Sequence, residues 1–303
     1  MISGIIPLYK PMGMTSFKCV SKIRGIVHQK KVGHSGTLDP NVDGVLPICL
    51  GHGTKIVDYL MASGKIYRGA ITLGFATTTE DLDGEIVAEN HDFTPLTTSQ
   101  IETGFKNFVG ETIQIPPMFS AIKVKGRRLY DYARNGEKVE RPKRTIKIDY
   151  FKQLGESIID EATQTQTIFF EVKCGKGTYV RTLAVDFGKQ FNIPAVMSQL
   201  TRTESGGFDL NQTVTFSQLE AASKHGELEK LIYPIDYALK AYPRIELSKS
   251  QWELVQHGGF IDTREVNTTE AKIVLGYNEK IRALYYKDVE NNRYKPFKMF
   301  NLD

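Results

Sequence analysis

Apolar positions along this chain recur either in short strand-like runs or at the three-to-four-residue spacing of a helix. The runs that predict strands lie at 4–9, 45–50, 65–77, 167–173 and 196–201. The segments that predict helices begin at Thr15 or Ser16 and near residues 53, 97, 127 and 179. Strands and helices are mixed without strict alternation, so the sequence predicts an α+β fold.

The pattern changes near residue 244. From there the chain contains a short helical run at 248–256, the stretch "HGGFI", and two small strand-like runs, "KIVLGY" and "KIRALYY". We therefore predict a main domain over 1–243 and a second, small β-rich domain over 244–303. The length of 303 residues fits two domains.

Composition excludes several classes of protein. The chain is 41% hydrophobic and 24% charged, which is ordinary for a globular protein. No apolar run approaches the roughly 20 residues that span a bilayer, and "MISGIIPLYKPMG" lacks the features of a secretory signal. Three cysteines without a CxxC pair fit a reducing compartment, so we expect a cytoplasmic protein that does not bind membranes.

The net charge of +4 is modest, but the basic residues are clustered. Residues 1–70 contain nine Lys and Arg against three acids, and residues 120–147 contain ten against three. One such cluster alone favours a solvated surface. Two clusters, the second with Tyr130 and Tyr132 among the cations, favour a nucleic acid partner, because aromatic rings stack on bases.

Motif searches leave one carboxylate as the candidate for chemistry. The six histidines form no metal-binding spacing, no GxxxxGK[ST] loop is present, and "GHSGT" is not the GxSxG of serine hydrolases. Asp39 lies in a glycine-rich loop before Pro40, where a turn or helix cap is the common role of Asp. A functional carboxylate would need a cationic partner, and the sequence does not choose among Arg68, Arg181 and Arg202.

Four blocks of sequence resemble the motifs of the TruB family of pseudouridine synthases. "GHSGTLDPNVDGVLPICLG" is similar to the family's GxxGTLDPxAxGxLxxxxG, and "LYKPMGMTSF" to its KPxGxTS. "KIYRGAITLG" followed by "TTTEDLDG" resembles the third block, and "CGKGTYVRTLAVDFG" the GTYxRxLxxDxG block. The blocks follow in family order through residues 8–188, and "SQLTRTESGGF" resembles a fifth element.

The resemblance implies a fold and an activity. The fold is a mixed, mainly antiparallel sheet flanked by helices, with a small β-rich PUA-like domain at the C-terminus. The activity is conversion of uridine-55 in the T-loop of tRNA to pseudouridine after the base is flipped out. It implies no cofactor and no metal. We expect tRNA as the partner, no required protein partner, and a monomer.

The resemblance also implies roles for residues in the matching blocks. Asp39 would be the essential catalytic carboxylate, and Arg181 would pair with it and keep its pKa low. Tyr67 would stack on the target uracil, with its hydroxyl placed to help with the C5 proton, and Leu200 would pack on the opposite side. Gly36 would permit close approach of the loop to RNA.

Further residues are implied to contact or position the RNA. His34 would insert into the vacated base stack, Asp81 would support that rearrangement, and Lys10 would brace the catalytic loop. A thumb-like insertion at about 116–144 would close on RNA through its charge and through Tyr130 and Tyr132. The candidate RNA-binding residues are His34, Lys10, Asp81, Tyr179, Leu200, Gly36, Arg127 and Arg128.

The residues that follow Asp39-Pro40 depart from the family pattern. Asn41-Val42-Asp43 replaces the usual small apolar residues, and we expect Asp43 to point to solvent because a second inward carboxylate would repel Asp39.

One alternative function is an RNA-binding or tRNA-folding protein without turnover. The other is a subunit of a guide-RNA-directed synthase, although the chain lacks a long Lys-rich tail and has its own thumb-like insertion.

Overall fold

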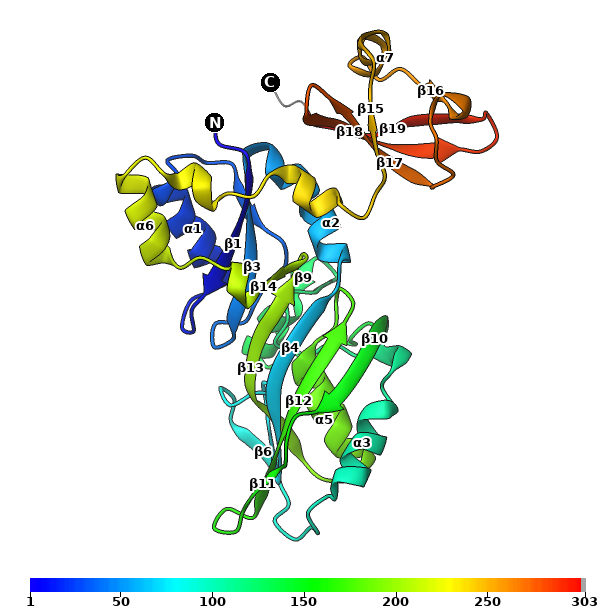
Figure 1. Cartoon of the computed structure of the whole chain (residues 1–303). Helices are drawn as coiled ribbons and strands as arrows, with labels where there is room; N and C mark the ends of the chain where they lie inside the picture. The colour runs from blue at the N-terminus through cyan, green and yellow to red at the C-terminus, as the bar shows by residue number, and fades with distance from the viewer. Residues whose placement is uncertain (301–303) are drawn as a thin grey trace.

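A ten-stranded sheet runs through the larger part of the protein (Figure 1), whose computed structural model describes residues 1–300. The strand order is β1-β3-β13-β4-β12-β10-β7, with β2, β11 and β14 paired at its sides. Among the described strand pairs of this sheet, only β13 and β3 pair in parallel. The mainly antiparallel sheet that the family resemblance implies is confirmed. The strands are β1 (Gly4–Lys10), β2 (Val32–His34), β3 (Asp43–Leu50), β4 (Lys65–Leu73), β7 (Gly110–Gln114), β10 (Arg144–Gln153), β11 (Ile158–Asp160), β12 (Thr165–Cys174), β13 (Ala195–Ser205) and β14 (Phe208–Asp209).

Helices and 3₁₀ turns pack on both faces of this sheet, because one apolar cluster lies on each side of β1 and β3 (Figure 1). They are α1 (Ser16–Ile26), α2 (Val57–Ala62), α3 (Thr98–Lys106), α5 (Val180–Gln190) and α6 (Phe216–Lys224), with 3₁₀ turns η1 (Gly51–Ile56), η2 (Leu210–Gln212), η3 (Leu228–Leu231) and η4 (Ile235–Leu239). Thr15 caps α1 as predicted, since its hydroxyl accepts the backbone N–H of Lys18 at 3.1 Å. Within residues 1–300 no helix is long and apolar enough to cross a membrane.

The packing of α3 and α5 on the sheet decides where α5 begins. Phe105 of α3 stacks on Phe151 of β10, with 3.9 Å between ring centroids, and also contacts Phe187 of α5 at 4.8 Å. All three rings are buried in the main core. This apolar layer fixes α5 against β13, so that its first turn lies beside the loop between β2 and β3.

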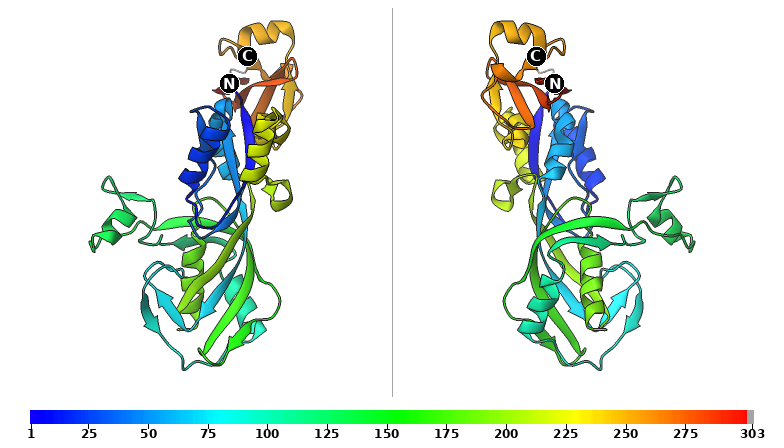
Figure 2. Two further views of the ribbon diagram at one scale, coloured as in Figure 1. Left: turned by 90° about the vertical axis from the view of Figure 1, so that its left-hand side faces the viewer. Right: turned by 90° about the vertical axis from the view of Figure 1, so that its right-hand side faces the viewer.

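The insertion at 116–144 projects from the body of the protein (Figure 2). It contains a two-stranded ribbon, β8 (Lys123–Val124) and β9 (Arg127–Arg128), followed by α4 (Leu129–Arg134). Leu129 and Tyr132 are buried in it, and the Tyr132 hydroxyl donates to the carbonyl of Val124. The expectation that Tyr132 stacks on RNA is therefore wrong, because this ring forms the small core of the projection. A second hairpin, β5 (Phe75–Thr77) and β6 (Ile86–Glu89), lies at the other end of the sheet.

A separate five-stranded sheet begins at Arg244, in the order β15-β17-β18-β19-β16. Its elements are β15 (Arg244–Glu246), α7 (Lys249–Val255), β16 (Ile261–Asp262), η5 (Thr263–Glu265), β17 (Lys272–Tyr277), β18 (Lys280–Asp288) and β19 (Arg293–Met299). It has its own apolar cluster. A second cluster joins it to the main body, where Val274 and Leu284 lie with Ile5 and Val45. The last three residues of the predicted 244–303 domain lie outside the described residues.

Two local predictions differ from the structure. The helix predicted from residue 53 is first a 3₁₀ turn, η1, and becomes α-helical only at Val57. Strand β10 was not predicted, because its segment was interpreted only as part of a basic stretch. Its alternation is nevertheless present, with Ile146 and Ile148 buried between exposed polar neighbours.

The outer face of the sheet carries a buried carboxylate with three partners. Glu171 on β12 accepts from Arg68 Nε at 2.8 Å and from the Tyr150 hydroxyl at 3.0 Å, and it pairs with Lys152 Nζ at 2.9 Å. Burial alone would raise the pKa of Glu171, but these bonds outweigh it and lower the pKa to about 2. The ionised form is therefore stabilised by folding.

We predict that Glu171→Gln destabilises the protein at neutral pH by roughly 1–3 kcal/mol, a range that allows for the exposure of its Arg68 and Lys152 partners. Because the folded pKa is depressed, the contribution of Glu171 is complete above its ordinary pKa of 4.5 and is lost as the pH falls towards about 2. Urea unfolding at a series of pH values measures this. The wild type should lose more stability on acidification than Glu171→Gln does. The control is Glu156→Gln, which changes an exposed acid that forms no ion pair within residues 1–300. Parallel curves of unfolding free energy against pH for the wild type and Glu171→Gln would contradict the prediction.

Candidate active site

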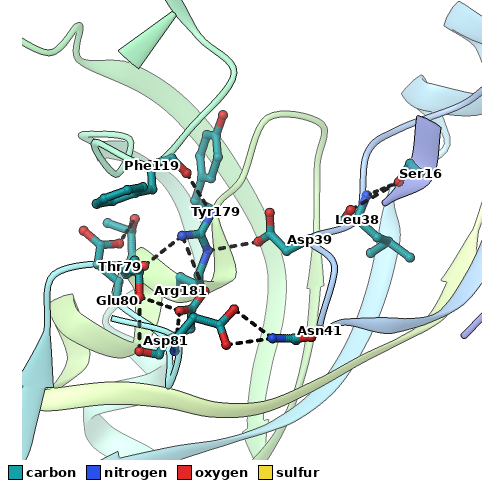
Figure 3. Close-up of polar contacts among 12 residues, drawn as sticks. Ser16, Leu38, Asp39, Asn41, Thr79, Glu80, Asp81, Phe119, Tyr179 and Arg181 are labelled. Carbon is teal, nitrogen blue, oxygen red and sulfur yellow. Dashed lines mark hydrogen bonds and ion pairs between the residues drawn. The ribbon is translucent and has the colours of Figure 1, made fainter. Parts of the chain in front are cut away.

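The loop between β2 and β3 places Asp39 by burying the residue before it. Leu38 is buried in the main core. Its N–H donates to Ser16 Oγ at 2.9 Å, and the Ser16 hydroxyl donates back to the Leu38 carbonyl at 3.2 Å (Figure 3). With Leu38 fixed inward, the side chain of Asp39 projects from the opposite side of the loop.

Lys10 supports the loop on the far side of Asp39. Its ammonium is completely buried and donates to the carbonyls of Pro11, Pro40 and Val42 at 2.9, 3.0 and 2.7 Å. Burial lowers the pKa of Lys10, opposed by nearby acidic groups. All three ammonium protons are used on carbonyls, so Lys10 acts on a ligand only through the loop that it holds.

Arg181 is the cation that pairs with Asp39. It lies in the first turn of α5, and its Nε is 3.0 Å from Asp39 Oδ2 (Figure 3). The other nitrogens donate to the carbonyls of Thr79 at 2.8 Å and Phe119 at 3.1 Å, and Nη1 lies 3.6 Å from Asp81 Oδ2. The guanidinium is buried, whereas the side chain of Asp39 is 43% exposed. The carboxylate is thus fixed from behind and open in front.

The other two candidate arginines lie elsewhere. Arg68 is on the outer face of the sheet with Glu171. Arg202 is completely buried beneath the loop, where its Nε donates to the Val45 carbonyl at 2.7 Å. The pairing of Asp39 with Arg181 that the family resemblance implies is therefore confirmed, whereas the residues alone had left the three arginines open.

A cleft of about 440 Å³ opens in front of Asp39. The predicted residues that line it are Gly36, Asp39, Tyr67, Tyr179, Arg181 and Leu200. Phe119 and Tyr130 from the projecting insertion also line it. The cleft thus combines one carboxylate with aromatic and apolar walls, an arrangement that fits a flat, polar-edged ring such as a nucleobase.

The electrostatics of Asp39 differ from the expectation. Desolvation by the cleft walls is the main cause that raises the pKa of the Asp39 carboxyl above its ordinary value of 3.8. The Arg181 guanidinium lowers this pKa, and the Asp81 carboxylate raises it. The net direction is upward, so the predicted low pKa of Asp39 is wrong. The ion pair is present, but it only offsets part of the desolvation.

Other predicted site residues lie beside the cleft or away from it. His34 does not line the cleft, and its Nδ1 accepts the Gly36 N–H at 3.3 Å. Burial lowers the pKa of His34. Arg127 and Arg128 are exposed on the projection. Arg127 is paired with Glu137 at 2.9 Å, and Arg128 donates to the Tyr130 hydroxyl at 2.8 Å.

Asp43 does not point freely to solvent, so this expectation is wrong. It accepts from the hydroxyls of Tyr9 at 2.5 Å and Thr201 at 2.6 Å. The bond to Asp43 is the main cause that raises the pKa of Tyr9 to about 12. Asp43 thus ties β1 and β13 to the end of the loop, and its charge is satisfied away from Asp39.

The sequence analysis missed a second link between loops. Asn41 Nδ2 donates to both carboxylate oxygens of Asp83 at 2.7 and 2.8 Å (Figure 3). This joins the catalytic loop to the turn that carries Asp81. The sequence identified Asn41 only as part of a departure from the family pattern. No local pattern links Asn41 to Asp83, because the two residues lie far apart in the chain. Among residues 1–300 no cluster of three metal-ligating side chains occurs.

Comparison with known proteins fits this geometry. Residues 24–180 match the family described as TruB family pseudouridylate synthase (N terminal domain), and residues 181–240 match the tRNA pseudouridylate synthase B C-terminal domain. The chain belongs to the TruB family of pseudouridine synthases. It is therefore an enzyme of the isomerase class. The boundary between the two matches lies at the start of α5, not at Arg244 where the second sheet begins.

Relatives of this TruB family member cover almost its whole length. It is 57% identical over 304 residues to the tRNA pseudouridine synthase B of Lactiplantibacillus plantarum, and 54% identical over 300 residues to that of Levilactobacillus brevis, each covering 99% of both chains. Among solved structures it is similar to a chain of a Cbf5-Nop10-Gar1 complex, with a TM-score of 0.73 and 26% identity over 98% of this chain and 84% of that one.

We predict opposite effects of two substitutions on the pKa of Asp39. Arg181→Met removes the cation that lowers this pKa and should raise it. Asp81→Asn removes an anion that raises it and should lower it. Carbon-13 NMR titration of labelled aspartate carboxyls measures both, with the Asp39 resonance assigned from Asp39→Asn. If only ionised Asp39 is active, the acidic limb of the pH–rate profile should move to higher pH in Arg181→Met and to lower pH in Asp81→Asn.

The control for this pair is Asp58→Asn, which removes an exposed carboxylate on α2. It should leave the Asp39 titration unchanged. A shift in the same direction for Arg181→Met and Asp81→Asn would contradict the assigned network.

Proposed function

We propose that this chain isomerises uridine-55 in the T-loop of tRNA to pseudouridine, with Asp39 as the essential carboxylate. The observation that carries the proposal is the Asp39–Arg181 pair, 3.0 Å apart, at the mouth of a cleft lined by Tyr67 and Leu200. The names of the relatives, tRNA pseudouridine synthase B, support the choice of tRNA.

The reaction is redox-neutral and conserves composition. The bond from C1′ of the ribose to N1 of the uracil breaks, the base rotates, and C1′ bonds to C5. The C5 proton is lost and N1 gains one. Attack of Asp39 at C1′, its addition to C6, and its removal of a 2′ proton all require an ionised carboxylate that reaches the sugar or base. The exposed front of Asp39 meets this requirement.

The cleft walls suit an everted base. Tyr67 would stack on the uracil, and Leu200 would pack on its other side. Burial raises the pKa of Tyr67, so at neutral pH its hydroxyl is protonated before the base enters. Flipping the base out costs a few kcal/mol. His34 would fill the vacated stack, and Asp81 would hold Arg181 during the rearrangement.

The rest of the RNA would bind outside the cleft. Arg127 and Arg128 would contact phosphates from the projecting insertion, and Tyr179 would contact the target nucleotide at its base. The domain proposed for 244–303 would hold the acceptor-stem side of the tRNA as a PUA-like RNA-binding unit. We propose that the protein acts in the cytoplasm as a monomer, without a protein partner.

We predict that Asp39→Asn abolishes turnover, with a loss of more than about 10³-fold. The assay is carbodiimide mapping of pseudouridine in an unmodified tRNA transcript. The amide has nearly the same shape, so tRNA affinity should change less than about threefold. Asp58→Asn is the control and should retain full activity.

The same experiment separates catalysis from binding alone. A protein that only binds or folds tRNA would yield no pseudouridine in the wild type, and Asp39→Asn would not differ from it. Undiminished turnover by Asp39→Asn would overturn the role of Asp39.

A further inference from the structure

Two buried cations meet beneath the catalytic loop. Lys65 of β4 is 7% exposed, and Arg202 of β13 is completely buried. Lys65 Cε and Arg202 Nη1 lie 3.4 and 3.7 Å from the position that a Cβ would occupy at Gly36. Gly36 has a φ of +121°, which a side chain rarely adopts. Because Gly36 has no side chain, the side chains of Lys65 and Arg202 occupy the recess behind the loop.

Neither cation has an anionic partner. Lys65 Nζ donates to the carbonyl of Met61 at 3.2 Å. Arg202 donates to the carbonyls of Val45 and Gly36, at 2.7 and 3.2 Å, and also interacts with the Tyr67 hydroxyl, while its Nη1 makes no hydrogen bond of normal geometry. Within residues 1–300 no carboxylate forms an ion pair with either side chain. Two like charges buried together without an anion are unfavourable, so the recess is built to receive a negative group.

Lys65 faces the cleft that a nucleotide would enter. It lies two residues before Tyr67 on the same strand, so the two side chains share one face of the sheet, and both line the cleft. The pKa of Lys65 is lowered to about 8, mainly by burial and also by the nearby cations Arg202 and Lys176, against an opposing effect of Cys174. This end of the cleft is therefore cationic and short of negative charge.

We propose that Lys65 forms a subsite for one backbone phosphate of the RNA next to the target uridine. The proposal rests on the proposed function, because it takes RNA as the ligand. A phosphodiester is the fixed negative charge that RNA carries, whereas uracil and ribose oxygens are neutral and would leave the two cations uncompensated. Arg202 is a positioning residue, which holds Gly36 by its carbonyl and faces the Lys65 ammonium across the recess.

This subsite differs from the basic surface of the projecting insertion. Arg127 is exposed and already paired with Glu137. Lys65 is buried and unpaired, so a phosphate there would gain a charge-assisted bond in a desolvated site. Loss of such a contact should weaken binding about tenfold. The phosphate would also favour the charged ammonium and raise the pKa of Lys65.

The test measures binding of T-stem-loop RNAs with one neutral methylphosphonate at each phosphodiester around the target uridine. All proteins are full chains and carry Asp39→Asn, so that no product forms. We expect the protein with Lys65 to lose about tenfold in affinity at one of these positions. The protein with Lys65→Met should bind the unmodified RNA about tenfold more weakly and show no further loss at that position.

Lys106→Met is the matched control. It removes an exposed lysine on α3, near the C-terminal end of α5 and far from the cleft, and should keep the penalty at that position. Equal binding of the unmodified RNA by Lys65→Met and its parent would overturn the proposal. So would a methylphosphonate penalty that survives in Lys65→Met at every position, since Lys65 would then contact no phosphate.

A second measurement does not depend on the folding of Lys65→Met. Carbon-13 labelling of lysine side chains reports the pKa of Lys65 in the protein with and without RNA. We expect it to rise on binding, and an unchanged value would overturn the proposal. Pseudouridine formation by the wild type is scored separately, so absence of turnover with an intact phosphate penalty would refute the proposed function and not the subsite.

Discussion

The ion pair between Asp39 and Arg181 is the contact on which the site depends. A buried guanidinium must satisfy its N–H groups, and the acceptors of Arg181 come from separate segments. They are Asp39 of the catalytic loop, the turn that carries Thr79 and Asp81, and Phe119 at the base of the projecting insertion. One side chain therefore holds together the loop, the turn and the insertion, and its place depends on how α5 packs on the sheet.

The loop between β2 and β3 is held on one side only, so that the Asp39 carboxylate stays partly exposed. The backbone around Asp39 is satisfied from beneath by the Lys10 ammonium, the Ser16 hydroxyl and the buried Arg202. These bonds hold the loop while leaving the front of Asp39 open to a ligand. The desolvation that accompanies this position raises the pKa of the carboxyl, and the guanidinium offsets only part of it.

Cations without acids recur around the cleft and fit a polyanionic ligand. Lys65 and Lys176 line the cleft, Arg202 lies behind Gly36, and the projecting insertion adds the ring of Tyr130, whose hydroxyl accepts a hydrogen bond from Arg128. The insertion is joined to the catalytic pair through the carbonyl of Phe119.

Local pattern determined much of this protein. Strands β1, β3, β4, β12 and β13, the Thr15 cap and the start of α5 follow from periodicity and capping, and the ordered motifs indicated the family and Asp39. The residues alone left Arg68, Arg181 and Arg202 open as partners of Asp39, the family motifs implied Arg181, and the tertiary structure confirmed that pair. The tertiary structure alone decided that desolvation raises the pKa of Asp39 and that the side chains of two cations, Lys65 and Arg202, lie together behind Gly36. Periodicity acts between neighbours in the chain, whereas desolvation and charge pairing depend on segments that only folding brings together.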